Sequence, residues 1–185
     1  PVYTTAAVER DEIHVTVSAS GTINPVATVS VGSQVSGRIQ DLYADFNSVV
    51  TCGQVVAQLE ESPFVTRVRQ SEATLAKAKA NVRLAKATYG RLKTLAEQHV
   101  ISSAELDDAL AKYEQAAAEE MQAQASLDSA RIDMEHATIY SPVDGTVLSR
   151  LVDVGQTVAA SFQAPELFKI AADLTKMQIE AKVDE

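Results

Sequence analysis

The sequence predicts an α+β protein in which a long antiparallel α-helical (coiled-coil) hairpin is inserted into a small, split β-sandwich. Three observations support this fold class. Residues 63–137 form a long, charged, alanine-rich segment with apolar residues at a seven-residue interval. A short β-rich phrase before this segment is similar to another phrase that follows it. Each phrase, on the order of 30 residues, is too short to bury a core alone, so we expect the two to share one sandwich.

The seven-residue interval in residues 63–137 is typical of a coiled-coil seam. The repeat breaks near residues 98–103 and then resumes, which predicts two helices folded back on each other, each about 50 Å long at about 1.5 Å per residue. The first helix carries two seam series, which are Val68, Leu75, Val82, Tyr89, Ala96 and Phe64, Ser71, Ala78, Ala85, Leu92. The series of the second helix are Leu106, Tyr113, Glu120, Leu127, Met134 and Ala109, Ala116, Ala123, Ala130, Ala137.

Capping residues predict where the two helices begin and end. Ser62 before Pro63 predicts an N-cap hydroxyl followed by a proline at the first helical position, where the missing N–H costs nothing. Ser102 with Glu105 three residues later has the pattern of a capping box, which predicts the start of the second helix. The β-branched residues 138–139 predict its end.

The β-rich phrases on either side of the hairpin share a pattern of short strands. Residues 143–147 repeat the pattern of residues 35–39, and we align Gln156 with Asn47 at the start of the next shared element. Residues 55–59 close the first phrase and residues 167–170 close the second. We expect strands from both phrases to pair in one sandwich.

Alternating polar and apolar residues predict further strands near both ends of the chain. One strand is predicted at residues 12–18, a turn at Gly21–Pro25 and a second strand at residues 26–31. A last strand at residues 177–183 is expected to pair with the N-terminal strand outside the sandwich. These strands predict part of a separate β-barrel.

Five regions summarise this organisation. They are N-terminal strands of a β-barrel or membrane-proximal region (1–30), the first sandwich half (31–62), the hairpin (63–137), the second half (138–172) and the first strand of a β-barrel domain (173–185). Because the β-barrel is incomplete, we expect the chain to be a piece of a longer protein with an anchor and further β structure.

Composition and motifs exclude several classes of function. The net charge of −9 and the absence of a basic stripe argue against a nucleic-acid partner. One cysteine, Cys52, rules out an internal disulfide and a multi-cysteine metal site. His14, His99 and His136 lie on separate predicted elements, which argues against a metal site. Nucleotide-binding and hydrolase motifs are missing, so the sequence predicts a protein that is not an enzyme.

The paired β-phrases resemble the two half-motifs of the biotinyl/lipoyl fold. Split by a helical hairpin, the chain resembles the periplasmic adaptors, or membrane fusion proteins, of bacterial tripartite pumps. Residues 31–37, 88–107 and 155–165 are similar to the macrolide-efflux (MacA-type) branch of these adaptors, which serves an ABC transporter. The resemblance covers nearly the whole chain.

The resemblance implies a binding site at the hairpin tip. Arg91, Leu95 and Ser102 have the spacing of the motif with which such adaptors bind a TolC-like outer-membrane channel. Each residue also has a simpler interpretation, because Arg91 suits a solvated helix surface, Leu95 a turn and Ser102 an N-cap. In the second half-motif, Phe162 stands where the family carries a glutamine that gates the lumen, and Gln163 stands beside it, so either is a candidate gate.

The resemblance also implies the function and partners of the chain. It implies a periplasmic adaptor, anchored to the inner membrane in the full-length protein, that joins an inner-membrane ABC transporter (MacB-like) to the channel as a homo-oligomer of six copies. An adaptor of a proton-driven (RND) pump or of a type I secretion system is the alternative. A lipoyl or biotinyl carrier needs a lysine at the turn of residues 60–63, which has none, so no cofactor is expected. A purely structural coiled coil would leave the paired half-motifs unexplained.

Overall fold

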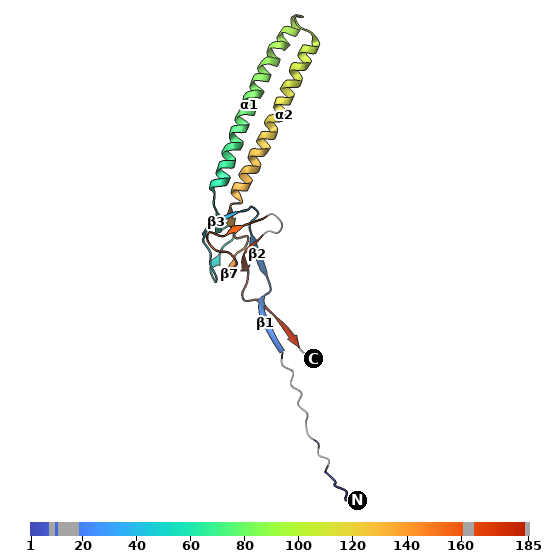
Figure 1. The fold of residues 1–185 in the computed structure, drawn as a ribbon, viewed down its shortest axis with the longest axis vertical. Coiled ribbons are helices and arrows are strands. Elements are labelled where there is room, and N and C mark those ends of the chain that lie inside the picture. Colours follow the sequence, from blue (N-terminus) through green and yellow to red (C-terminus); the bar gives the residue numbers. More distant parts are fainter. Residues whose placement is uncertain (8–9, 11–18, 161–164, 184–185) are drawn as a thin grey trace.

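The computed structural model describes residues 1–7, 10, 19–160 and 165–183. The molecule is elongated, with a helical hairpin at one end, a small sandwich in the middle and a two-stranded ribbon at the other end (Figure 1). None of the described helices combines the length and the apolar composition needed to cross a membrane. The elements are β1 (Ala19–Pro25), β2 (Thr28–Gly32), β3 (Gly37–Leu42), β4 (Val49–Val50), β5 (Val55–Leu59), α1 (Ser62–Glu97), α2 (Ser103–Glu135), β6 (Thr138–Tyr140), β7 (Gly145–Arg150), β8 (Thr157–Val158), β9 (Glu166–Ala171) and β10 (Met177–Val183).

Two four-stranded sheets make the sandwich, and each contains strands from both sides of the hairpin. One sheet has the order β2-β9-β7-β4 and the other has the order β6-β5-β3-β8. In each sheet, two central strands from one half-motif are flanked by two strands from the other half. The prediction of a split sandwich with an inserted hairpin is therefore confirmed.

Up to β4 in the first half and β8 in the second, the two halves repeat each other at a constant separation in the chain. Ser33 and Ser141 are both 1% exposed, and each donates its hydroxyl hydrogen to the carbonyl oxygen two residues later, at 2.6 Å. Asn47 and Gly155, at the same separation, both have a positive φ, of 61° and 86°. The predicted alignment of Gln156 with Asn47 is therefore wrong by one residue, because the backbone needs its left-handed residue one position before Gln156.

The sandwich core also holds the base of the hairpin. Side chains that are less than 2% exposed come from both sheets, and they include Phe168, Ile39, Leu59, Leu167, Ile170, Val50, Val56 and Val147. Phe64 from the first turn of α1 and Ala137 just after α2 belong to the same cluster, with exposures of 8% and 0%. The hairpin is thereby rooted in the core.

The predicted coiled-coil seam is confirmed between α1 and α2. The two helices lie side by side along their length (Figure 1), and Tyr89 stacks on Tyr113 with ring centroids 6.1 Å apart. Of the predicted seam positions, Met134 is the exposed exception at 37%, and Glu120 is half-buried. The buried seam residues of the two helices are Phe64, Leu75, Ala78, Ala109, Ala116, Ala123, Leu127 and Ala130.

The prediction of Ser62 as the N-cap of the first helix is wrong. Glu61 is the N-cap, with φ −75° and ψ −24°, and no side chain caps the helix there. Because Glu61 already has helical dihedral angles, Ser62 is the first helical residue, and its carbonyl accepts a hydrogen bond from the Thr66 hydroxyl at 2.9 Å. Pro63 is the second helical residue and not the predicted first one, but it still lies in the first turn.

The ribbon beyond the sandwich pairs β1 with β10 in antiparallel fashion. The predicted strand at residues 177–183 is confirmed as β10. The predicted turn at Gly21–Pro25 is wrong, because these residues belong to β1, and Pro25 is tolerated at the last pair of the ladder, opposite Met177. The predicted strand at residues 12–18 lies outside the described residues.

Candidate functional site

The candidate site is the tip where α1 ends and the chain turns into α2. Helix α1 closes with a Schellman motif, in which the His99 N–H bonds to the Ala96 carbonyl at 2.9 Å and the Val100 N–H to the Leu95 carbonyl at 3.0 Å. His99 takes the left-handed position of this motif with φ 59°, where glycine is the usual residue. These bonds satisfy carbonyl groups that a helix end leaves open, and they fix the direction of the turn.

Helix α2 begins with the capping box that the sequence predicts. The Ser102 hydroxyl accepts a hydrogen bond from the Glu105 N–H, and the Glu105 carboxylate accepts one from the Ser102 N–H, both at 3.3 Å. The Ser102 oxygen is engaged as an acceptor in this cap, while its hydroxyl hydrogen has no partner among the described hydrogen bonds. Ser102 can thus cap α2 and still donate one hydrogen bond outward.

Arg91 and Leu95 lie one turn apart on α1, below the tip. A spacing of four residues places both on the same helix surface. Arg91 is exposed, and its guanidinium contacts only the Thr88 hydroxyl among the described hydrogen bonds, at 3.4 Å. Leu95 is 37% exposed. The predicted motif therefore presents a cation and an apolar side chain on one surface, with Ser102 at the turn above them.

Two further residues of the turn complete its surface. Val100 is 66% exposed, whereas Ile101 is half-buried. Val100 therefore adds exposed apolar area to that of Leu95.

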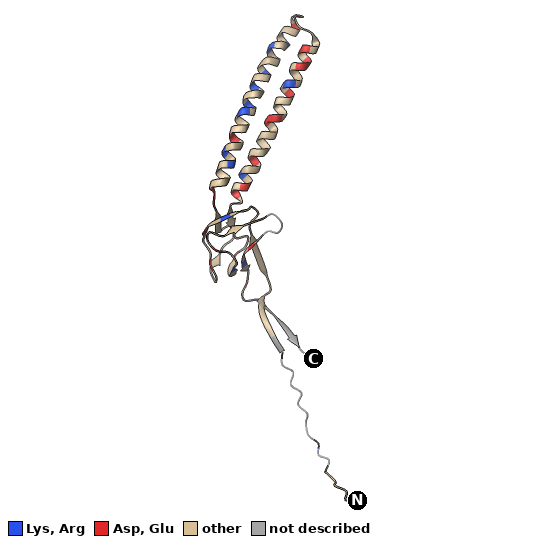
Figure 2. Ribbon diagram, in the orientation of Figure 1, with Lys and Arg blue, Asp and Glu red and all other residues tan. Residues whose placement is uncertain are grey.

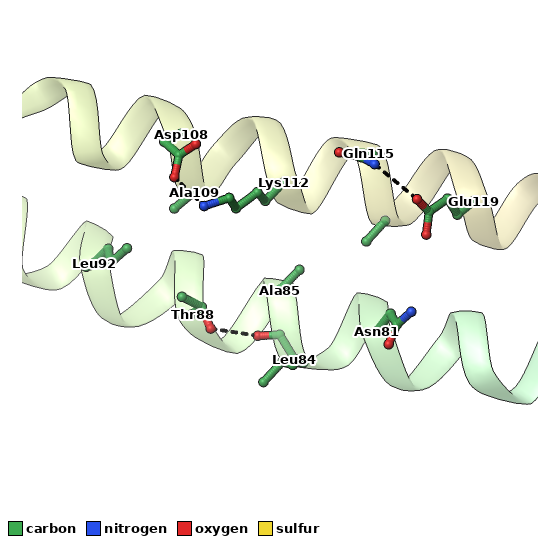
Figure 3. A pocket seen from close by; sticks show the side chains of 11 residues that line it. Asn81, Leu84, Ala85, Thr88, Leu92, Asp108, Ala109, Lys112, Gln115 and Glu119 are labelled. Atoms are coloured by element: carbon green, nitrogen blue, oxygen red, sulfur yellow. Dashed lines mark hydrogen bonds and ion pairs between the residues drawn. The ribbon is translucent and has the colours of Figure 1, made fainter.

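A shallow groove runs between the two helices below the tip (Figure 3). Its volume is about 370 Å³, and seam alanines form part of its wall because their short side chains fill little space. Along its rim Lys112 pairs with Asp108 at 2.6 Å, and the Gln115 amide donates to Glu119 at 3.1 Å. The lining residues are Asn81, Leu84, Ala85, Thr88, Leu92, Asp108, Ala109, Lys112, Gln115, Ala116 and Glu119.

The candidate gate residues Phe162 and Gln163 lie outside the described residues. The chain that leads to them follows β8, and the Ala160 N–H donates to the Ser36 hydroxyl oxygen at 2.9 Å. This contact joins the second half-motif to the first. Seven residues separate β8 from β9, whereas four separate the equivalent strands β4 and β5.

The sequence reading missed one feature of the hairpin, which is the separation of charge between its helices. Cations lie mostly on α1 and anions mostly on α2 (Figure 2). A count of charged residues in each predicted helix would have revealed this pattern.

Comparisons with known proteins agree with this geometry. Residues 67–137 match the family model described as "RND MFP, alpha-helical hairpin domain". The macrolide export protein MacA of Yersinia pestis is 34% identical over 197 residues, which cover 99% of this chain and 53% of that protein. The multidrug resistance protein MdtA of Proteus mirabilis is 27% identical over 165 residues, which cover 89% of this chain and 40% of that protein.

A solved structure extends the similarity to three dimensions. The crystal structure of MacA from Actinobacillus actinomycetemcomitans superposes with a TM-score of 0.59 at 33% identity, over 89% of this chain and 54% of that one. The chain spans about half the length of the curated relatives it matches. Its hairpin, its split sandwich and its similarity to MacA over nearly all of its residues place the chain in the membrane fusion protein family of periplasmic adaptors.

Proposed function

We propose that this chain is the central part of an adaptor in a tripartite efflux pump. The adaptor bridges an inner-membrane ABC transporter of the MacB type and a TolC-like outer-membrane channel, and it forms part of a sealed export conduit in the periplasm. Its role is structural, with no catalytic step. The observation that carries this proposal is the exposed tip motif at the end of a hairpin that is rooted in the sandwich core.

The tip offers three kinds of contact to a channel. Arg91 carries several N–H donors, which suit backbone carbonyls or carboxylates at the end of a helical hairpin. Leu95 and Val100 add apolar area, and the Ser102 hydroxyl hydrogen adds one donor. Because both helix ends are closed by their own caps, these side chains are presented on a fixed backbone.

The rest of the proposed architecture follows the five regions expected from the sequence. The full-length protein is anchored to the inner membrane, and six copies stand side by side with their hairpins pointing to the outer membrane. The ribbon of β1 and β10 belongs to a β-barrel region nearer the inner membrane. Six rods of this kind would enclose a lumen along the axis of the ring.

The experiment that tests this function is a charge reversal at the tip. In cells that express the full-length protein, Arg91→Asp is expected to abolish drug export and cross-linking to the channel, because a carboxylate cannot donate the hydrogen bonds. Lys77→Asp is the matched control, since Lys77 is exposed on the same helix surface, two heptads from Arg91 and farther from the tip. Full drug resistance and full cross-linking in the Arg91→Asp strain would refute the tip assignment.

A second candidate function is an adaptor of a proton-driven RND pump. Two findings favour it, namely the family model for RND hairpins and the similarity to MdtA. Purification of the full-length protein with its transporter decides between the two candidates. An ATPase in the complex supports the first, and a proton antiporter supports the second.

We also propose that Phe162 or Gln163 narrows the lumen of the ring. The Ser36 contact supports this indirectly, because it fixes the start of the segment that carries both residues. Phe162→Ala and Gln163→Ala, each in the full-length protein, are expected to raise the leak of a small dye through the assembled conduit. An unchanged leak in both variants would remove the gate from the proposal.

A further inference from the structure

The two helices of the hairpin carry opposite charge (Figure 2). Helix α1 has eight Lys and Arg residues against two Glu, a net charge of +6, and α2 has nine Asp and Glu residues against two Lys and Arg, a net charge of −7. Among the ion pairs that the structure describes, two join α1 to α2, namely Arg67–Asp133 at 3.0 Å and Arg131–Glu72 at 3.4 Å. Both lie in the half of the hairpin near the sandwich, so attraction within the hairpin does not account for most of these charges.

Some of the charges lie on the helix surfaces that face away from the partner helix. On α1, Arg69 and Arg83 each follow a seam valine by one residue, which rotates them by about 100° around the helix. On α2, Glu114 and Asp128 hold the same heptad position, one residue after a seam residue. All four side chains are exposed.

Between these charges, the outer surface of each helix carries a row of small residues. The alanines on this surface are exposed and seven residues apart, and they are Ala73, Ala80, Ala87 on α1 and Ala111, Ala118, Ala125 on α2. Short side chains let another helix approach to about 8 Å between axes. The alanines alone would accept any helix. The flanking charges select one, because the cationic surface of α1 attracts the anionic surface of α2.

We propose that, in the ring of the proposed function, the outer surface of α1 in one copy packs antiparallel against the outer surface of α2 in the next copy. Arg69 then faces Asp128 of its neighbour, and Arg83 faces Glu114. The two cations and the two anions are each two heptads apart, so both charge pairs form at a single register. The same register sets Ala80 close to Ala118.

This contact has a direction, which decides how the assembly grows. Each copy offers a cationic surface on one side and an anionic surface on the other, so the contact is heterologous and closes into a ring if the rotation allows it. A pair of like helices would set Arg69 and Arg83 against each other and is disfavoured. Within one hairpin, Tyr89 of α1 lies opposite Tyr113 of α2. The register proposed between neighbouring hairpins is offset from this one by about five residues, or about 7 Å along the helix, so neighbouring hairpins tilt relative to each other.

Disulfide cross-linking of the full chain tests the contact without a channel or a transporter. In a Cys52→Ser background, the double variant Ala80→Cys, Ala118→Cys is expected to form a ladder of disulfide-linked oligomers on oxidation. Each single-cysteine variant is expected to form none, because Ala80 meets Ala118 and not another Ala80. A single variant that cross-links as well as the double variant, or a double variant that does not cross-link, would overturn the proposal.

Charge reversal then tests the ionic pairs. Arg69→Glu with Arg83→Glu, or Glu114→Lys with Asp128→Lys, is expected to lower the cross-linked yield roughly tenfold, because like charges then meet. An equal mixture of these two charge variants, and a chain with all four changes, should regain the original yield. If circular dichroism shows unchanged helicity and the mixture does not restore the cross-linked yield, the proposed pairing is contradicted.

Salt supplies an independent measurement on the unmodified charges. The Debye length falls from about 10 Å at 0.1 M ionic strength to about 3 Å at 1 M, so the cross-linked yield should fall over that range. An increase or no change would point to an apolar contact instead. All of these variants leave Arg91 untouched. Failure of the Ala80→Cys, Ala118→Cys pair to cross-link, with channel binding retained, refutes this inference alone, whereas cross-linking without channel binding refutes the proposed tip alone.

Discussion

The two ends of the sandwich carry different appendages at equivalent positions. By the internal repeat, the junctions of β5 and β6 with the hairpin correspond to the junctions of β9 and β2 with the ribbon. At the hairpin end, Phe64 and Ala137 are buried in the core, and the Leu59 N–H bonds to the Ala137 carbonyl at 2.8 Å. Buried side chains and a backbone hydrogen bond therefore fix the hairpin to the sandwich.

The ribbon end has the same topology but no comparable packing. Val26 and Leu174 are 57% and 40% exposed, and the Ala172 N–H reaches the Ala27 carbonyl at 3.3 Å. No described strand of the sandwich pairs with β1 or β10. Equivalent attachment points thus give a stiff junction between sandwich and hairpin and a pliable junction between sandwich and ribbon. The difference lies in a few buried side chains.

The largest expected effect on stability comes from removing a buried side chain at the stiff junction. Phe64→Ala should lower the free energy of unfolding by about 3 kcal/mol, because it removes a buried ring and leaves a cavity in the core. Val26→Ala at the pliable junction, where the side chain is exposed, should change it by less than about 0.5 kcal/mol. Urea denaturation of both variants measures the contrast, and equal losses would mean that the two junctions are packed alike.

A charge in the seam should lower the stability of the hairpin by a smaller amount. Leu127→Asp places a carboxylate at a position that is 3% exposed, with an expected loss of about 2 kcal/mol and of helical signal on heating. Ile23→Asp in the ribbon serves as the control, since Ile23 is 63% exposed. Thermal unfolding followed by circular dichroism compares them, and unchanged melting of Leu127→Asp would count against the seam.

The smallest effect concerns pH at the pliable junction. Hydrogen bonds from the Thr175 hydroxyl and the Thr175 N–H hold the pKa of Asp173 below its usual value of 3.8. A depressed folded-state pKa means that these bonds stabilise the junction above pH 3.8 and are lost as pH falls through the folded pKa. The Thr175 amide proton should titrate in NMR spectra over that range, and Asp173→Asn should abolish the titration. A titration that persists in this variant would assign it to another group.

Local patterns predicted the hairpin well, because a heptad repeat and a capping box depend on residues that are close in the sequence. The seam residues and the Ser102 cap are found where the sequence places them. Ser62 failed as a cap because the backbone of Glu61 already follows the helix, which side-chain chemistry alone does not reveal.

Long-range pairing was harder to predict. Gly21–Pro25 has the composition of a turn, yet β10, more than 150 residues later, provides a partner that makes it a strand. The half-motifs were recognised, but their alignment slipped by one residue because the shared positive φ of Asn47 and Gly155 is visible only in the structure. The tip motif follows from the family resemblance, whereas the opposite charges of the two helices are contained in the sequence and form no part of that prediction.

The shared sheets have a consequence for folding. β5 and its neighbour in the sheet, β6, are separated in the sequence by the 78 residues of the hairpin. A flexible loop of that length would make their encounter slow, but α1 and α2 join through contacts that are nearer in sequence and form faster. As the chain folds, pairing of α1 with α2 is expected to bring the second group of strands to the first. The hairpin would then assist the folding of the sandwich into which it is inserted.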